Sequence, residues 1–133
     1  MNTIDYKINQ ALNVADIVRV FDRSGIQRPT QDSARIGKMF AHANLVISAW
    51  DDQQLIGVAR ALTDHSYCCY LSDLAVDADY QKQGVGHQLI EMVRTHIGEQ
   101  VSLILLSAPQ AMGYYPKVGF TQLDNAFAIK RKH

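Results

Sequence analysis

The sequence predicts a single α+β domain built around a mixed β-sheet. Two observations carry this prediction. Three β-prone segments follow one another between residues 45 and 76, separated by short polar turns, as in an antiparallel meander. Segments with helical spacing precede and follow that meander. No linker, charge block or internal repeat divides the 133 residues, so residues 1–133 are expected to form one domain with the order β-α-α-β-β-β-α-β-α-β-β.

The first part of the chain predicts one strand and two helices. The strand is expected around Asp5–Asn9. Asn13 is a suitable cap for the first helix, and Gly25 suits the left-handed position that ends a helix. Arg28-Pro29 interrupts helical structure, so the second helix is expected to start near Thr30 or Asp32.

The middle of the chain predicts the meander itself. Leu45–Trp50 reads as a buried strand, and Asp51–Gln54 as a tight turn. Leu55–Leu62 is the second arm of this hairpin, and Tyr67–Val76 is the third strand.

The last part predicts a helix, a buried strand and a closing hairpin. Apolar residues repeat on one helical face over Gly84–Ile97. Val101–Leu106 is almost wholly apolar, which is typical of a strand covered on both faces. Pro109–Val118 suits a short helix, and the hairpin is expected from Phe120–Leu123 and Ala126–Arg131.

Composition excludes several classes of protein. Thirteen basic and thirteen acidic residues cancel, which argues against binding nucleic acid by bulk charge. No apolar run approaches the ~20 residues of a membrane span, and the N-terminus lacks the pattern of a signal peptide. Cys68 and Cys69 are adjacent and the five histidines show no ligand spacing, so neither disulfides nor a metal is expected. A cytoplasmic location follows as the expectation.

A glycine-containing loop at residues 80–88 predicts an anion site. It lies between a strand and an amphipathic helix, and Gly84 and Gly86 leave backbone amides without side-chain cover at the helix start. Such amides and the positive end of the helix dipole suit a pyrophosphate, and Lys82 could add charge. The alternative is a loop that merely begins a helix. The P-loop pattern is absent, and Leu89 stands where a dinucleotide fingerprint needs glycine.

Three segments resemble one known family. The run Gln81–Gly86 matches the (Gln/Arg)-x-x-Gly-x-(Gly/Ala) signature of the GCN5-related N-acetyltransferase (GNAT) superfamily. Leu71–Asp77 looks like the family's cofactor-facing strand, and Tyr114–Phe120 resembles its aromatic-Tyr-x-Lys-x-Gly-Phe segment. The resemblance extends from near residue 4 to residue 131. It implies the acyl-CoA N-acyltransferase fold, in which Tyr67–Val76 and Val101–Leu106 are splayed central parallel strands, and a transferase that uses acetyl-CoA.

The same resemblance implies which residues hold acetyl-CoA. Backbone groups of Leu74, Ala75 and Val76 would pair with the pantetheine arm as if it were an added strand. Gln81 opens the signature, and the amides that would bind the pyrophosphate belong to Gln83, Gly84, Val85, Gly86, His87 and Gln88.

Two residues are candidates for catalysis. Tyr115 falls where the family places its general acid, and an unperturbed Tyr keeps its proton at neutral pH. The alternative for Tyr115 is a half-buried packing role. Asp73 on the cofactor strand has three open interpretations: a general base, a contact for a cationic substrate, or a structural hydrogen bond.

The acceptor is expected to be a primary amine of a small or amino-acid-like molecule. Arg28 could bind a carboxylate or phosphate, and Arg60 could line the pocket, although either could instead be a solvated or paired surface residue. Two other functions stay open: a non-catalytic acyl-CoA sensor, and an acetyltransferase acting on protein N-termini or lysines. Ala126–Arg131 is a candidate edge for a homodimer.

Overall fold

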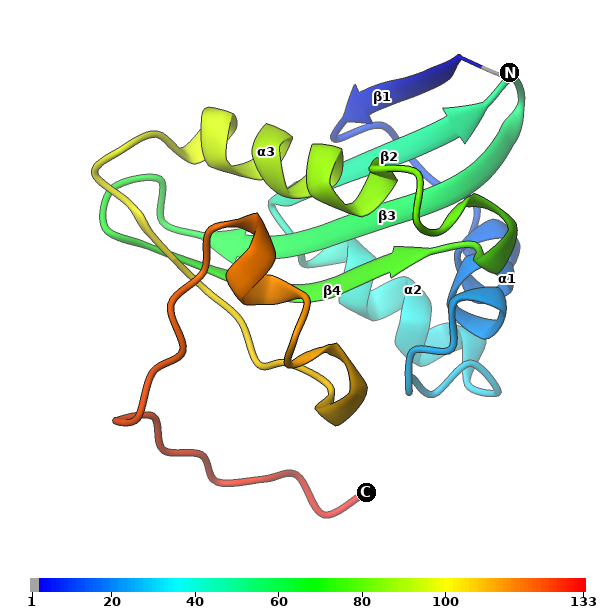
Figure 1. The fold of residues 1–133 in the computed structure, drawn as a ribbon. Coiled ribbons are helices and arrows are strands. Elements are labelled where there is room, and N and C mark those ends of the chain that lie inside the picture. Colours follow the sequence, from blue (N-terminus) through cyan, green and yellow to red (C-terminus); the bar gives the residue numbers. More distant parts are fainter. Residues whose placement is uncertain (1–2) are drawn as a thin grey trace.

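A five-stranded sheet with helices on both faces forms the centre of the molecule (Figure 1). The structure is a computed structural model, and it describes residues 3–133. The strands lie in the order β1-β2-β3-β4-β5; all neighbours are antiparallel except β4 and β5, which are parallel. The elements are β1 Ile4–Ile8, α1 Val14–Ser24, α2 Ser33–Ala41, β2 Leu45–Asp51, β3 Gln54–Thr63, β4 Cys68–Val76, α3 Val85–Ile97 and β5 Ser102–Ile104.

Each face of the sheet has its own hydrophobic core. Because side chains alternate along a strand, β2 sends Leu45 and Ile47 toward α3, and Val46 and Trp50 toward α1 and α2. Helix α3 completes the first core with five buried residues, Val85, Leu89, Ile90, Val93 and Ile97. Helices α1 and α2 complete the second core with Ile17, Val20, Phe21 and Ile36.

Most of the expected elements are present within a residue or two of their predicted bounds. Asn13 caps α1 by accepting from the Ala15 amide at 2.9 Å, and Gly25 ends this helix in the left-handed conformation. Asp32 caps α2, so the later of the two predicted starts is right. The meander forms as predicted, with β2 and β3 joined by a tight turn. None of the helices that the structure describes is long and apolar enough to cross a membrane.

The strand predicted at Val101–Leu106 is shorter and less buried than expected. Only Ser102–Ile104 is a strand, and burial alternates along the segment, with Ile104 and Leu106 exposed. Val101, Leu103 and Leu105 pack against the α3 core. The prediction of cover on both faces is wrong because α1 and α2 pack over β2, β3 and the end of β4, and leave the second face of β5 bare.

The closing hairpin predicted from Phe120–Leu123 and Ala126–Arg131 does not form. Among residues 3–133, no strand follows β5, and Pro109–Val118 makes two short 3₁₀ turns in place of a helix. Figure 1 shows the last residues as an extended segment apart from the sheet. Phe127 and Ile129 are fully exposed. A three-residue β5 offers little edge for a hairpin to join, so the homodimer edge expected at Ala126–Arg131 is also without a strand.

Candidate active site

The loop before α3 presents a row of backbone amides in one direction. Lys82 (φ 64°) and Gly84 (φ 86°) both adopt left-handed conformations, which turn the chain sharply into the helix. Gly84 caps α3 without a side-chain hydrogen bond. Among residues 3–133, no protein acceptor pairs with the amides of Lys82, Gln83, Gly84, Val85, Gly86 and His87.

We call these six amides the amide cradle. Successive amides at a helix N-terminus, where the dipole is positive, form a binding site for phosphate groups. A Cβ at Gly86 would lie 3.0 Å from the Tyr114 hydroxyl oxygen, so a larger residue here would require that hydroxyl to move. Gln88 is not counted in the cradle, because its amide donates to the Gly84 carbonyl at 3.0 Å.

Side chains below the loop hold the cradle in place. The Gln81 side-chain amide donates to the Val76 carbonyl at 2.8 Å and to the Ser24 carbonyl at 3.2 Å, so it ties the loop to both β4 and α1. Gln83 donates to the Asp79 carbonyl at 3.2 Å. Both glutamine side chains therefore position the loop by donating to backbone carbonyls of the protein.

Strand β4 has an open edge immediately before the loop. Its pairing with β5 covers only Cys68–Tyr70, and β4 then continues for six residues beyond β5. Because the Asp77 amide donates to Ile56 of β3, the alternation of an antiparallel ladder turns the backbone groups of Leu74 and Val76 away from β3. Ala75, between them, is turned toward β3. The separation of β4 and β5 predicted from the sequence is thus present, and its open edge suits an extended ligand arm.

A β-bulge at Ser72 redirects Asp73. Arg60 pairs with Asp73 and Ala61 with Leu71, which leaves Ser72 without a partner. Leu71 packs in the α3 core, whereas Ala75 packs in the α1–α2 core, so the side-chain alternation changes face across the bulge. Asp73 is consequently buried on the α1–α2 face.

Asp73 lies between the two arginines that the sequence singles out. Its Oδ1 accepts from Arg28 Nε and its Oδ2 from Arg60 Nε, each at 2.5 Å. Both arginines also bind Ser72: Arg28 through its carbonyl at 2.7 Å, and Arg60 through its hydroxyl at 2.9 Å. The Arg60 guanidinium stacks over the Phe40 ring at 5.6 Å. The geometry favours the structural interpretation of Asp73, because its carboxylate is fully buried and already pairs with two arginines.

Tyr115 begins the 3₁₀ turn Tyr115–Val118 and packs between two rings. Ring centroids of Tyr114 and Phe120 lie 5.2 and 5.5 Å from it, both edge-on. Burial raises the pKa of Tyr115 above its usual value, and the positive charge of Arg28 partly opposes this rise. The hydroxyl therefore keeps its proton at neutral pH. Burial also raises the pKa of Tyr114, whose hydroxyl faces Gly86.

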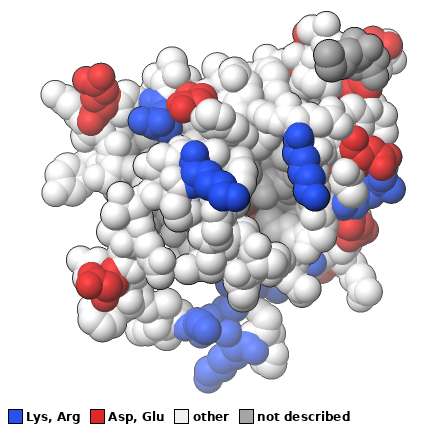
Figure 2. Space-filling model, in the orientation of Figure 1, with Lys and Arg blue, Asp and Glu red and all other residues white. Residues whose placement is uncertain are grey.

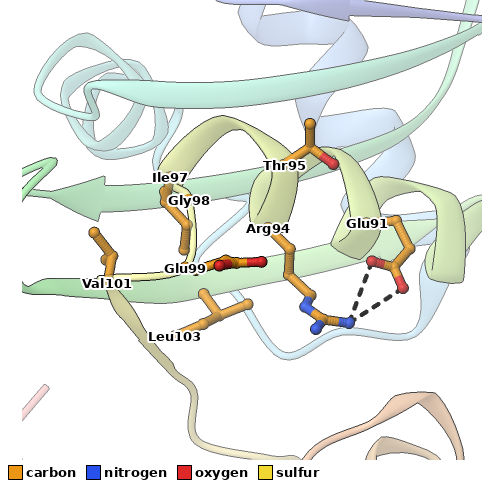
Figure 3. Close-up of a pocket in the computed structure, with 8 residues that line it drawn as sticks. All are labelled: Glu91, Arg94, Thr95, Ile97, Gly98, Glu99, Val101 and Leu103. Carbon is orange, nitrogen blue, oxygen red and sulfur yellow. Dashed lines mark hydrogen bonds and ion pairs between the residues drawn. The ribbon is translucent and has the colours of Figure 1, made fainter.

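Two surface hollows lie near these elements. One, of about 380 Å³, is lined by the α1–α2 loop residues Arg28, Pro29, Thr30, Gln31 and Asp32. The other, of about 550 Å³, lies between the last turns of α3 and β5 and is shown in Figure 3, where Arg94 reaches back to Glu91. The second hollow lies at the far end of α3 from the amide cradle, so we do not assign it to the site.

Acidic and basic side chains are mixed on the face of the molecule that Figure 2 shows, with basic ones bordering a recess near its centre. In residues 3–133, no three His, Cys, Asp or Glu side chains are grouped so that they could hold a metal ion. A phosphate group bound at the amide cradle would be held by amides and a helix terminus rather than by a broad basic patch.

Comparisons with known proteins find relatives of this chain. A family model described as an acetyltransferase (GNAT) domain matches residues 16–130. An uncharacterized N-acetyltransferase, ycf52, from Gracilaria tenuistipitata var. liui is 30% identical over 116 residues, covering 84% of this chain and 64% of that protein. Histone acetyltransferase TAP1 from Glycine max is 39% identical over 72 residues, covering 53% of this chain and 31% of that protein.

A solved structure shares the fold across its whole length. Aminoglycoside N-acetyltransferase AAC(6')-Iy in complex with CoA covers 100% of this chain and 97% of its own, with a TM-score of 0.75 and 17% identity. The chain spans less than two thirds of the length of the two curated relatives named above. These matches confirm the predicted fold class and the resemblance stated from the sequence.

Proposed function

The chain belongs to the GNAT acetyltransferase family, and we propose that it moves the acetyl group of acetyl-CoA to the primary amine of a small or amino-acid-like acceptor. The observation that carries this proposal is the amide cradle at the N-terminus of α3, next to the open edge of β4. A pyrophosphate and an extended arm are the two parts of CoA that such a pair of features suits. AAC(6')-Iy, which shares the fold, was solved with CoA bound.

In this proposal the cofactor is held mainly by backbone groups. The amides of Gln83, Gly84, Val85, Gly86 and His87 bind the pyrophosphate. Leu74 and Val76 offer outward backbone groups to the pantetheine arm, while Ala75 keeps β4 paired with β3. Lys82 contributes an amide and a charge at the rim.

Tyr115 is proposed to act as the general acid. The acceptor amine attacks the thioester carbonyl carbon, the C–S bond breaks, and Tyr115 donates its proton to the departing thiolate. The proton lost by the attacking nitrogen leaves through solvent. Tyr115 is protonated at neutral pH, as a general acid must be, because burial raises its pKa above the usual value. Asp73 is not given the role of base, since both its oxygens accept from arginines.

The test of the general acid is Tyr115→Phe, which keeps the ring packing and removes the donor. We expect kcat to fall ~10²–10⁴-fold at neutral pH, with little change in the affinity for acetyl-CoA. Tyr114→Phe is the matched control, because it removes the neighbouring hydroxyl and should cost far less in kcat. Equal rates for Tyr115→Phe and the wild type on a confirmed acceptor would reject the assignment.

A panel of amines separates this function from the two alternatives. Tight acetyl-CoA binding without turnover of any amine or lysate protein would indicate a sensor. Transfer to lysate proteins but to no small amine would indicate a protein acetyltransferase, as the name of TAP1 describes for that relative. We further propose a cytoplasmic setting, in keeping with the free thiols of Cys68 and Cys69.

A further inference from the structure

Arg28 keeps unused hydrogen-bond donors next to its ion pair. A guanidinium has five N–H donors. Arg28 directs Nε to Asp73, one Nη1 hydrogen to the Gln27 carbonyl and one Nη2 hydrogen to the Ser72 carbonyl. Within residues 3–133, the remaining donor on each of Nη1 and Nη2 has no protein acceptor. Two donors on adjacent terminal nitrogens match the two oxygens of a carboxylate.

The cluster around Arg28 carries an excess of positive charge. Arg28 and Arg60 share the single carboxylate of Asp73, whose side chain is fully buried, and Ser72 supplies only neutral oxygens. The acid nearest in the α1–α2 loop is Asp32, and its Oδ1 accepts from the Arg35 amide as the cap of α2. Among the described residues 3–133, one positive charge of the cluster therefore remains without a carboxylate partner.

Arg28 is also placed where an acceptor could reach both it and the reacting centre. Its side chain is 23% exposed and lines the 380 Å³ hollow of the α1–α2 loop. Its Nη2 donates to the Ser72 carbonyl at 2.7 Å, two residues before Leu74 on β4. A group bound at Arg28 would thus lie beside the stretch of β4 that is proposed to hold the pantetheine arm.

From this placement we infer that Arg28 binds a carboxylate of the acceptor, so that the substrate class is an amine that also carries a carboxylate. This inference rests on the proposed acetyl transfer, and it adds that the acceptor carries a negatively charged carboxylate. The carboxylate takes the two remaining guanidinium donors, and Asp73 keeps Nε, which fixes the plane of the fork. A polycationic amine lacks the group that Arg28 would bind, and it would meet the positive charge of the cluster.

The test compares matched acceptors by the rate of CoA release. Each of the common amino acids is assayed beside its carboxamide, which keeps the amine and removes the negative charge. We expect kcat/KM for the preferred amino acid to exceed that for its amide about 10–100-fold, the range for a charge-assisted bidentate contact. In Arg28→Gln, KM for the acid should rise about 10–100-fold with kcat largely kept, while KM for the amide barely changes.

Two further variants keep the result interpretable. Arg28→Lys keeps a charge beside Asp73 but loses the planar fork, so it should fold and still lose most of the preference for the acid. Arg35→Gln removes a charge from an exposed position on α2 and should retain the wild-type preference.

Two results would overturn the inference while leaving acetyl transfer intact. One is equal use of acids and amides by the wild type. The other is preferred use of phosphoethanolamine over every amino acid, which would identify a phosphate site. If no amine in the panel accepts the acetyl group, the proposed function itself fails.

Discussion

Asp73 lies between arginines that are 45 and 13 residues away in the chain. No local pattern in the sequence predicts this pairing, because it depends on the bulge at Ser72 and on how the α1–α2 loop packs against β4. The prediction from the sequence put Asp73 on the correct strand, and a structural hydrogen bond was one of its three open interpretations. The structure adds that the side chain faces α1 and α2, where it binds Arg28 and Arg60. Long-range contacts of this kind decide a residue's role and are visible only once the fold is known.

Asp77 forms a second buried ion pair, which supports the start of the loop. Its side chain is 2% exposed and accepts from Arg23 Nε at 2.9 Å and Arg19 Nη1 at 3.3 Å. Burial raises the pKa of Asp77, but the hydrogen bond from the Asp79 amide and the charges of Arg23 and Arg19 outweigh it, so the pKa is lower than usual. The ionised carboxylate therefore stabilises the folded state.

Asp77→Ala should lower the free energy of unfolding by about 3 kcal/mol, because it leaves two arginines without their buried partner. Chemical denaturation at neutral pH measures this loss. Asp79→Ala is the matched control: Asp79 is 77% exposed, and removing its pair with Arg23 should cost less than about 1 kcal/mol. Similar losses for the two variants would contradict the assignment.

The same carboxylate gives stability a defined pH dependence. Because the folded-state pKa of Asp77 is depressed, its contribution is fully present above the unfolded value of about 3.9. It is lost as pH falls through the folded-state value. The difference in unfolding free energy between the wild type and Asp77→Ala should therefore shrink in acid.

At the scale of elements, the loop and α3 were the most predictable part of the site. The information is local: two glycines, a preceding strand and an amphipathic helix lie within consecutive residues. The amide cradle follows from those features, because the first backbone N–H groups of any helix have no acceptor within the helix. The predicted β5 was too long and too buried, because an apolar run looks the same in the sequence whether one face of the strand or both faces are covered. The predicted closing hairpin was wrong because alternation shows only that two faces differ, and not that a partner strand exists.

Gly84 tests the cradle, and Gly25 offers a matched control. Both adopt the left-handed conformation, with φ 86° in each and ψ 3° and 1°, and neither has a heavy atom within 4 Å of an added Cβ. Alanine at either position should cost about 1–2 kcal/mol of stability through backbone strain. We expect Gly84→Ala alone to weaken acetyl-CoA binding, by about tenfold in a calorimetric titration, since its strain shifts the amides. Equal affinities for the two variants would show that the cradle does not bind the cofactor.

At the scale of the whole molecule, the folded body ends well before the chain does. The sheet, both cores and the proposed site lie within residues 4–120, and the last residues add no strand to them. The zero net charge is compatible with the proposed cofactor site. A phosphate site made of amides and a helix terminus needs no basic surface, and acidic and basic side chains are mixed on the face that Figure 2 shows.

The exposed tail should contribute little to stability. Phe127→Ser combined with Ile129→Ser should change the free energy of unfolding by less than about 0.5 kcal/mol, because both side chains are fully exposed. Ile90→Ala, which removes a fully buried side chain from the α3 core, should cost about 2–5 kcal/mol by comparison. Hydrogen exchange should find the tail amides unprotected. Protected amides at residues 126–131, with a marked loss of stability in the double variant, would show that the tail pairs with the sheet.

Acetyl transfer itself is the central claim, and isotope-labelled acetyl-CoA tests it most directly. The full chain is incubated with labelled acetyl-CoA and the panel of amino acids and amides, and the products are read by mass spectrometry. The account predicts an amino acid that carries the label on its amine, CoA released in equal amount, and a ~10²–10⁴-fold slower reaction with Tyr115→Phe. Tight binding of acetyl-CoA with no labelled amine, small or protein-bound, would contradict it.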